Sequence, residues 1–158
     1  MGMNLDRPIL RDLLHGVALV TRGMTLGVRG IAIDAQNRVC LVRHTYIRGW
    51  YLPGGGIEPR ETAGDAMTRE FREETGIVVD PAVPLRLHGF FLNTAHRGRD
   101  HVAVYVAPAF TVPNPKRPDR EIAECGFFPL DALPPDTTRG SRQRLLEIRE
   151  GSAPSGLW

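Results

Sequence analysis

Along this chain of 158 residues, short continuous apolar runs alternate with segments in which apolar residues recur every three or four positions. Short apolar runs bounded by turn-forming residues predict strands at residues 25–33, 39–43, 77–79, 85–93 and 102–112. The run at 39–43 follows a turn at residues 34–37 and is expected to form a buried hairpin with the run before it. Apolar positions spaced by three or four predict helices at about residues 6–22, 62–76 and 139–150. This order of elements predicts the α/β class, with a mixed sheet between helices in an α/β/α sandwich.

The helix predicted at residues 62–76 has an acidic end on its buried side. Thr62 suits the N-cap, with Asp65 as its capping-box partner, and Gly76 suits the left-handed position after the last turn. One helical stripe begins apolar and ends in carboxylates, and its members are Ala63, Met67, Glu70 and Glu74.

Glu70, Glu73 and Glu74 therefore fall within a turn and a half of this helix. Like charges at such spacings destabilise a helix by about 0.2–0.5 kcal/mol per pair, a penalty that a divalent cation would remove. Mg²⁺ binds carboxylate oxygens together with phosphates and water. A run of glycines, residues 54–56, precedes the helix and allows backbone to approach metal and phosphate. These features indicate a metal site, and a solvated acidic face is the alternative.

The same residues resemble the Nudix box, whose pattern is Gly-x5-Glu-x7-Arg-Glu-U-x-Glu-Glu-x-Gly-U, where U is normally aliphatic. The chain matches its fixed positions with Gly55, Glu61, Arg69, Glu70, Glu73, Glu74 and Gly76. Phe71 departs from the pattern at the first U position but remains apolar. The resemblance implies the Nudix α/β/α sandwich and an Mg²⁺- or Mn²⁺-dependent pyrophosphohydrolase that acts on a nucleoside diphosphate linked to another group. It does not identify a subfamily.

By this resemblance, Glu73 and Glu74 would hold the cation together with the Gly54 carbonyl. Glu70 would be a further ligand or the general base, and Arg69 would orient Glu70 or Glu73 by ion pairing.

Around this group, Glu61 and Gly55 would support the loop and the helix. Later in the chain, Glu121 aligns with a carboxylate that some members of the family add to the metal site, and Glu124 competes with it. An exposed strand residue is the alternative for either glutamate.

Three arginines are candidates for contact with substrate phosphates: Arg43, Arg48 and Arg97. Arg97 lies in the polar turn at residues 94–100, which is equally typical of a solvated hairpin tip. A nucleoside triphosphate or a nucleotide sugar fits the resemblance. An RNA 5′ end, and a catalytically silent domain that senses a nucleotide, remain as alternatives.

The composition fits a single globular domain over residues 1–158, with 42% hydrophobic and 24% charged residues. A net charge of +2 is too small to favour nucleic acid as the principal partner. The chain has no apolar run of membrane-spanning length and no signal-peptide pattern, so a cytoplasmic location is expected, with Cys40 and Cys125 as reduced thiols. The amphipathic helix at 6–22 is interpreted as part of the core or of a homodimer interface, and a membrane-docked helix is the alternative.

Overall fold

The computed structural model describes residues 23–94 and 98–158, so the helix predicted at 6–22 and Arg97 lie outside the described residues. The helices are α2 (Ala63–Thr75) and α3 (Arg139–Glu150). The strands are β1 (Thr25–Ala32), β2 (Arg38–His44), β3 (Val78–Val79), β4 (Arg86–Asn93), β5 (Asp100–Ala107), β6 (Phe110–Thr111) and β7 (Ile122–Pro129). Neither described helix is long and apolar enough to cross a membrane.

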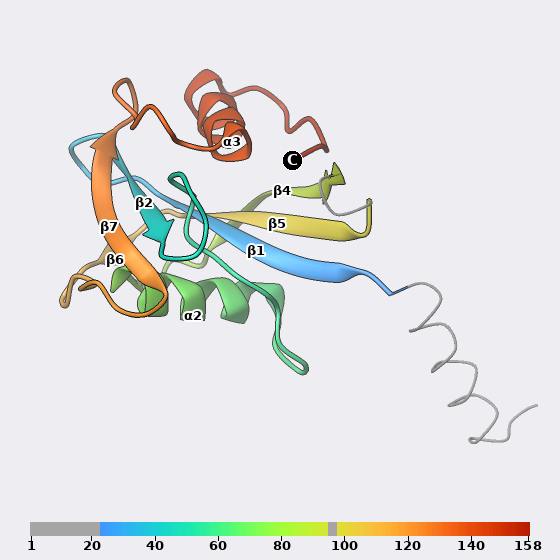
Figure 1. Ribbon diagram of the computed structural model, residues 1–158, viewed down its shortest axis with the longest axis horizontal. Helices are drawn as coiled ribbons and strands as arrows, with labels where there is room; N and C mark the ends of the chain where they lie inside the picture. The colour runs from blue at the N-terminus through green and yellow to red at the C-terminus, as the bar shows by residue number, and fades with distance from the viewer. Residues whose placement is uncertain (1–22, 95–97) are drawn as a thin grey trace, which may run out of the picture.

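The strands form a layer between the two helices, with α2 on one side and α3 on the other (Figure 1). β5 is the centre of a mixed sheet in the order β1-β5-β4, with β1 parallel and β4 antiparallel to it. β2 pairs antiparallel with β7, and the short strands β3 and β6 pair with each other. The predicted α/β/α arrangement with a mixed sheet is therefore confirmed.

Two strand predictions were wrong in detail. The runs at 25–33 and 39–43 were expected to form a hairpin, but they share only the isolated bridge between Ile33 and Val39. Both runs are apolar because layers cover them on both faces, and such a pattern does not specify the neighbouring strand. The run at 102–112 is also interrupted after β5 by Pro108, which has no backbone N–H to donate to a ladder.

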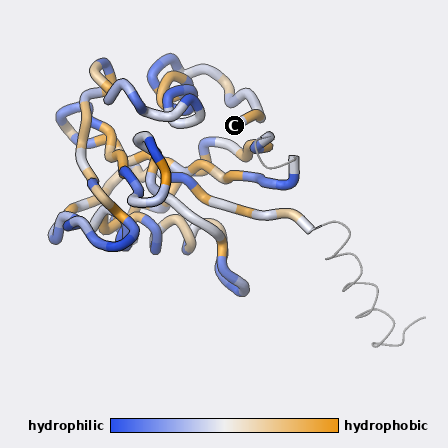
Figure 2. Tube along the Cα trace, in the orientation of Figure 1, coloured by the Kyte–Doolittle hydropathy of each residue, from blue (hydrophilic) through white to orange (hydrophobic). Residues whose placement is uncertain are grey.

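Alternating side chains of β1 enter different hydrophobic clusters. Val28 packs in a cluster with Met67 and Phe71 of α2, whereas Ile31 packs in a cluster with Leu145 of α3. This alternation is the two-residue period of a strand covered on both faces. Figure 2 shows hydrophobic residues along the strands and a hydrophilic tip on the loop that leads into α2.

The ends of α2 follow its sequence. The Thr62 side chain accepts a hydrogen bond from the backbone N–H of Asp65, and Gly76 adopts the left-handed conformation with φ 76°. Its burial is one-sided, since Met67, Glu70 and Glu74 are buried. The helix therefore presents its acidic end to the interior, beside the glycine run, and this placement builds the site described next.

Candidate active site

A hydrogen bond from a backbone N–H of the glycine run holds the side chain of Glu74. The Gly54 N–H donates to Glu74 Oε2 at 2.7 Å, while the Val28 N–H donates to the Gly55 carbonyl at 2.9 Å. Gly54 has φ 144°, and a Cβ added to it would lie 2.0 Å from the Val28 carbonyl oxygen. Only glycine can occupy this position, because both the backbone conformation and the approach to β1 exclude a side chain.

Gly55 has a different neighbour. A Cβ added to it would lie 2.6 Å from Glu70 Oε1. The second glycine therefore leaves the space that the Glu70 carboxylate occupies. A side chain at Gly56, by contrast, would meet no atom within 4 Å.

Arg69 binds the acidic groups on the outer side of the site. Its guanidinium donates to Glu61 Oε1 at 2.9 Å, to Glu70 Oε1 at 2.6 Å and to Glu73 Oε2 at 3.2 Å. It also donates to the Gly56 carbonyl at 3.1 Å. Arg69 therefore neutralises part of the charge of these carboxylates, so a cation is not needed to offset all of their repulsion.

The carboxylates of α2 differ in their environment. The Glu73 side chain is 59% exposed, whereas that of Glu74 is 6% exposed. Burial raises the pKa of Glu74 to about 7, although the hydrogen bond from Gly54 opposes this shift. Burial also raises the pKa of Glu70, against the opposing hydrogen bond from Arg69. Desolvation of a carboxylate favours its neutral form, so the two buried acids are the groups that a cation would stabilise most in the charged form.

Glu121 and Glu124 lie in different environments. Glu124 forms an ion pair with Arg43 at 2.7 Å, and both side chains are about half exposed. Glu121 lies with His44 and Glu74 in a group whose potential ligand atoms are all within 4.8 Å of one another. Of the two competing candidates, the structure thus brings Glu121 close to one buried carboxylate of α2, that of Glu74.

His44, the last residue of β2, was absent from the sequence interpretation. Its side chain is 4% exposed, and Nε2 lies 3.8 Å from Glu74 Oε1. Its Nδ1 is buried without a hydrogen-bond partner among the described residues. Burial lowers the pKa of His44, and the nearby charge of Arg29 lowers it further. A neutral imidazole offers a lone pair on one ring nitrogen, and this imidazole lies beside the carboxylates of Glu74 and Glu121. Nitrogen and carboxylate oxygen atoms grouped in this way fit the ligand preferences of a divalent cation.

Arg29 is a second residue that the sequence interpretation missed. It is the one charged residue in the apolar run at 25–33, which is the signal that could have identified it. Its Nη1 donates to the carbonyls of Leu52 and Gly54, both at 2.9 Å. The carbonyl expected to bind metal therefore already accepts one hydrogen bond, although a carbonyl oxygen has a second lone pair.

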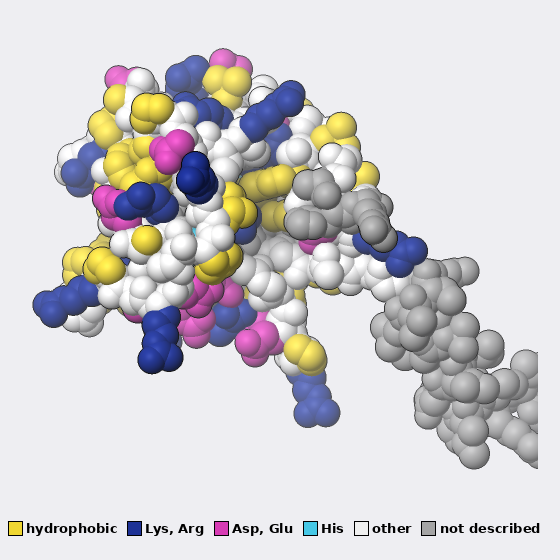
Figure 3. Space-filling model, in the orientation of Figure 1, with side chains coloured by type: hydrophobic (Ala, Val, Ile, Leu, Met, Phe, Trp, Pro, Cys, Tyr) yellow, Lys and Arg dark blue, Asp and Glu magenta, His cyan; other side chains and the backbone are white. Residues whose placement is uncertain are grey.

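A cavity of about 730 Å³ opens beside this group. It is lined by the segment 43–49, which includes His44 and the predicted phosphate contacts Arg43 and Arg48, and by Ala123 and Asp136. Acidic side chains gather over α2 in Figure 3, with basic side chains beside them. The arrangement can therefore place an anionic ligand between arginine guanidinium groups and the carboxylate site.

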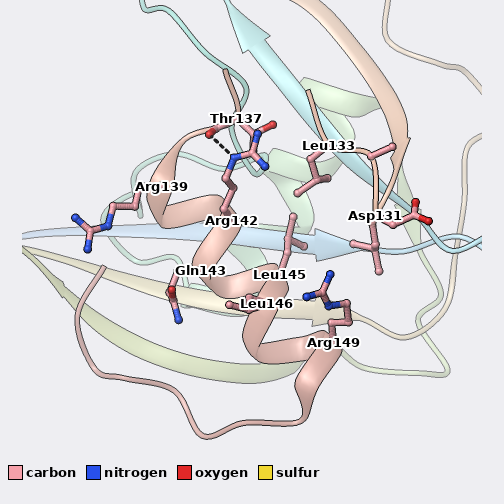
Figure 4. Close-up of a pocket in the computed structure, with 11 residues that line it drawn as sticks. Asp131, Leu133, Thr137, Arg139, Arg142, Gln143, Leu145, Leu146 and Arg149 are labelled. Carbon is pink, nitrogen blue, oxygen red and sulfur yellow. Dashed lines mark hydrogen bonds between the residues drawn. The ribbon is translucent and has the colours of Figure 1, made fainter. Parts of the chain in front are cut away.

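A second cavity, of about 510 Å³, lies along α3. Its lining includes Leu133, Leu145 and Arg142, and Figure 4 shows Arg142 turned towards Thr137 within the protein. Arg142 donates to the Thr137 carbonyl at 3.0 Å, so its guanidinium is committed to the loop before α3. None of its lining residues belongs to the group of His44, Glu74 and Glu121, whereas His44 lines the cavity of about 730 Å³.

Comparisons with known proteins give consistent results. A family model described as NUDIX domain matches residues 23–147. The 8-oxo-dGDP phosphatase NUDT18 of Mus musculus is 30% identical over 113 residues, which cover 68% of this chain and 33% of that protein. The ADP-ribose pyrophosphatase of Methanocaldococcus jannaschii is 31% identical over 112 residues, which cover 69% of this chain and 64% of that protein. The chain thus spans less than two thirds of the length of either relative.

A solved structure supports the same relationship. The crystal structure of a MutT NUDIX hydrolase from Burkholderia pseudomallei matches with a TM-score of 0.66 and 26% sequence identity, over 78% of this chain and 97% of that one. The resemblance carried by the residues from Gly55 to Ile77 is therefore confirmed over most of the chain.

The raised pKa of Glu74 predicts a pH-dependent stability in metal-free protein. Between pH 4.5 and about 7, folded Glu74 keeps a proton that the unfolded chain releases. Because the folded state then binds more protons, the free energy of unfolding falls as pH rises through this window and levels off above it. The full contribution is about 3 kcal/mol. Urea unfolding in EDTA at pH 5 and pH 8 measures it.

The matched variants are Glu74→Gln and Glu73→Gln. Glu74→Gln retains an oxygen that can accept from the Gly54 N–H but cannot ionise, so its stability should fall less between pH 5 and pH 8 than that of the wild type. Glu73→Gln leaves Glu74 in place and should keep the wild-type difference. An unchanged difference in Glu74→Gln would show that the titrating group lies elsewhere.

Proposed function

We propose, because the chain belongs to the Nudix hydrolase family, that it hydrolyses a pyrophosphate bond in a nucleoside diphosphate linked to a second group, with a divalent cation as cofactor. The second group would be a further phosphate, as in a nucleoside triphosphate, a sugar or a similar moiety. The observation that carries the proposal is the buried Glu74, grouped with Glu121 and with His44, a residue that also lines a cavity containing Arg43 and Arg48.

The substrate class rests on the relatives as well as on the cavity. One relative is a phosphatase of 8-oxo-dGDP and another a pyrophosphatase of ADP-ribose, both of which contain a nucleoside diphosphate. In this chain, the guanidinium groups of Arg43 and Arg48 would bind the phosphate oxygens, since arginine matches phosphate geometry with paired donors.

In the proposed reaction, water adds to one phosphorus of the bridge and the bridging P–O bond breaks. The leaving phosphate keeps the bridging oxygen and its electron pair, and the proton of the water passes to a base. A divalent cation, Mg²⁺ or Mn²⁺, would lower the pKa of the water and neutralise charge on the phosphate oxygens. Glu73, Glu74 and Glu121 would provide carboxylate oxygens for it.

Glu70 is the candidate for the base, or for a further ligand. Its burial raises its pKa towards the range in which a carboxylate accepts a proton efficiently near neutral pH. Arg69, at 2.6 Å, fixes the orientation of the Glu70 carboxylate, and Gly55 leaves space for it. Glu61 holds Arg69 from the opposite side at 2.9 Å. The fixed residues of the box would thus position Glu70 through contacts among themselves.

Purified protein should release phosphate products from at least one member of a panel containing a nucleoside triphosphate, a nucleoside diphosphate, ADP-ribose and a nucleotide sugar. EDTA should abolish the release, and either Mg²⁺ or Mn²⁺ should restore it. A folded Glu74→Gln variant should lose most of the activity, which excludes a contaminating hydrolase. Hydrolysis that persists in excess EDTA would overturn the metal mechanism.

Arg48→Ala should lower kcat/KM about tenfold on the substrate that the panel identifies, mainly through KM, because a charged hydrogen bond to phosphate contributes about 1.5–3 kcal/mol. Arg43→Ala should act in the same direction. The control is Arg38→Ala, at the start of β2, the strand that also contains Arg43. Arg38 pairs with Asp34 at 2.7 Å and does not line the cavity. Losses of equal size in Arg48→Ala and Arg38→Ala would remove the phosphate-binding role.

Gly55→Ala should lower kcat by about 10- to 100-fold, because its Cβ would displace the Glu70 carboxylate and misplaced catalytic groups cost rates of this order. The displaced atoms are the end of a flexible side chain, so the thermal midpoint should change little. Gly56→Ala is the matched control, since its Cβ meets open space. Steady-state kinetics and melting curves of both variants decide the matter, and equal kinetic effects would contradict the prediction.

A further inference from the structure

The side chain of His44 is buried, and it makes no hydrogen bond with any of the described residues. Nδ1 has no partner there, and Nε2 lies 3.8 Å from Glu74 Oε1, beyond hydrogen-bond distance. Unpaired polar atoms in the interior are costly, and a buried imidazole normally has a partner on at least one nitrogen. The imidazole is therefore placed for a partner other than a protein hydrogen bond.

The backbone fixes His44 beside Glu121. The β2–β7 ladder changes register between Arg43 and His44, where Arg43 faces Glu124 but His44 faces Ile122. Such a bulge redirects side chains at the end of a strand. Beyond it, the Thr45 N–H donates to the Glu121 carbonyl at 2.9 Å.

Aromatic rings restrict the orientation of the imidazole. The Tyr46 ring lies 5.2 Å from the His44 ring, and the Tyr51 ring lies 5.7 Å from it with an edge-on geometry. The distance from His44 to Glu74 also suits a shared ion. Two ligands of one ion, each at about 2.1 Å from it, lie about 3–4 Å apart, which is close to the separation of Nε2 and Oε1.

We propose that His44 is a direct ligand of the divalent cation, together with Glu74 and Glu121, and that its imidazole makes this site prefer a first-row transition-metal ion such as Mn²⁺ to Mg²⁺. The inference rests on the proposed metal-dependent function and adds to it the identity of the cation. Mg²⁺ is bound through oxygen and retains much of its water, whereas imidazole is a ligand for transition-metal ions.

The other arrangement that the same residues allow is a simple ion pair. A protonated His44 would then neutralise Glu74 without touching the cation. In that case Mn²⁺ would show no bond to nitrogen, and replacement of His44 would alter the stability of the metal-free protein rather than the choice of metal. The two arrangements are therefore distinguishable by the coordination of bound Mn²⁺.

The test uses Mn²⁺ alone with the full chain, without substrate. Pulsed electron paramagnetic resonance should detect coupling of bound Mn²⁺ to ¹⁴N in the wild type, and ¹⁵N-labelled histidine should replace it with ¹⁵N coupling. In His44→Gln this coupling should disappear. Titrations should show Mn²⁺ affinity reduced about tenfold or more and Mg²⁺ affinity reduced less than threefold, so that the preference for Mn²⁺ falls.

His101→Gln is the matched control. His101 also has a buried Nδ1 without a partner among the described residues, but its ring stacks on Phe90 at 5.1 Å and belongs to no potential metal group there. This variant should keep the nitrogen coupling and both affinities.

Absence of nitrogen coupling in the labelled wild type overturns the inference even if His44→Gln fails to fold, as does coupling that survives in a folded His44→Gln. Nitrogen coupling without hydrolysis of any panel substrate would instead separate the metal site from the proposed function.

Discussion

The hydrogen bond from the Gly54 N–H to Glu74 is the contact on which the site depends, because it joins the glycine run to α2 inside the protein. A carboxylate buried this deeply is costly unless its charge is met by donors or by a cation. The bond requires glycine at position 54, where Val28 of β1 leaves no space for a Cβ. A strand, a loop and a helix that are separate in the sequence are thereby held in one geometry, and a change in any of them moves the buried charge.

Two arginines donate hydrogen bonds to different parts of the site. Arg69 donates to Glu61, Glu70 and Glu73 on the accessible side, and so counters the repulsion among neighbouring acids of one helix. Arg29 approaches from β1 and donates to the Gly54 carbonyl, close to the buried side. Glu74 has no ion pair with either of them among those found in the described residues. Among the described residues, the one group at ion-pair distance from Glu74 is His44, whose burial favours the neutral imidazole, so no protein cation at that distance offsets a charge on Glu74.

Signals within a few residues in the sequence were sufficient to predict α2 and α3. The cap residues Thr62 and Gly76 act within a few residues of the helix they delimit, and helical periodicity needs no knowledge of the rest of the chain. The pairing of β1 with β5 was not predictable in the same way, because strands covered on both faces carry no alternation that selects a neighbour. The position of Glu121 depended on a bulge, and a register change of one residue turns a strand's side chains to the other face. His44 was missed because a single histidine at the end of an apolar strand has no spacing pattern.

The separation of the carboxylates from the cavity wall explains why the box alone could not identify a substrate. Glu70, Glu73 and Glu74 stand on α2, which a hydrogen bond between Gly54 and Glu74 joins to the glycine run. The cavity wall is instead formed by the segment 43–49, in which Tyr46 is 71% exposed and Ile47 is 47% exposed. Loops held on a rigid scaffold tolerate change more readily than the elements that carry them. The segment combines apolar surface, which can contact a nucleotide base, with guanidinium groups, which are complementary to phosphate. Selectivity in the proposed reaction would therefore be set by side chains that can vary without disturbing Glu74 or its partners.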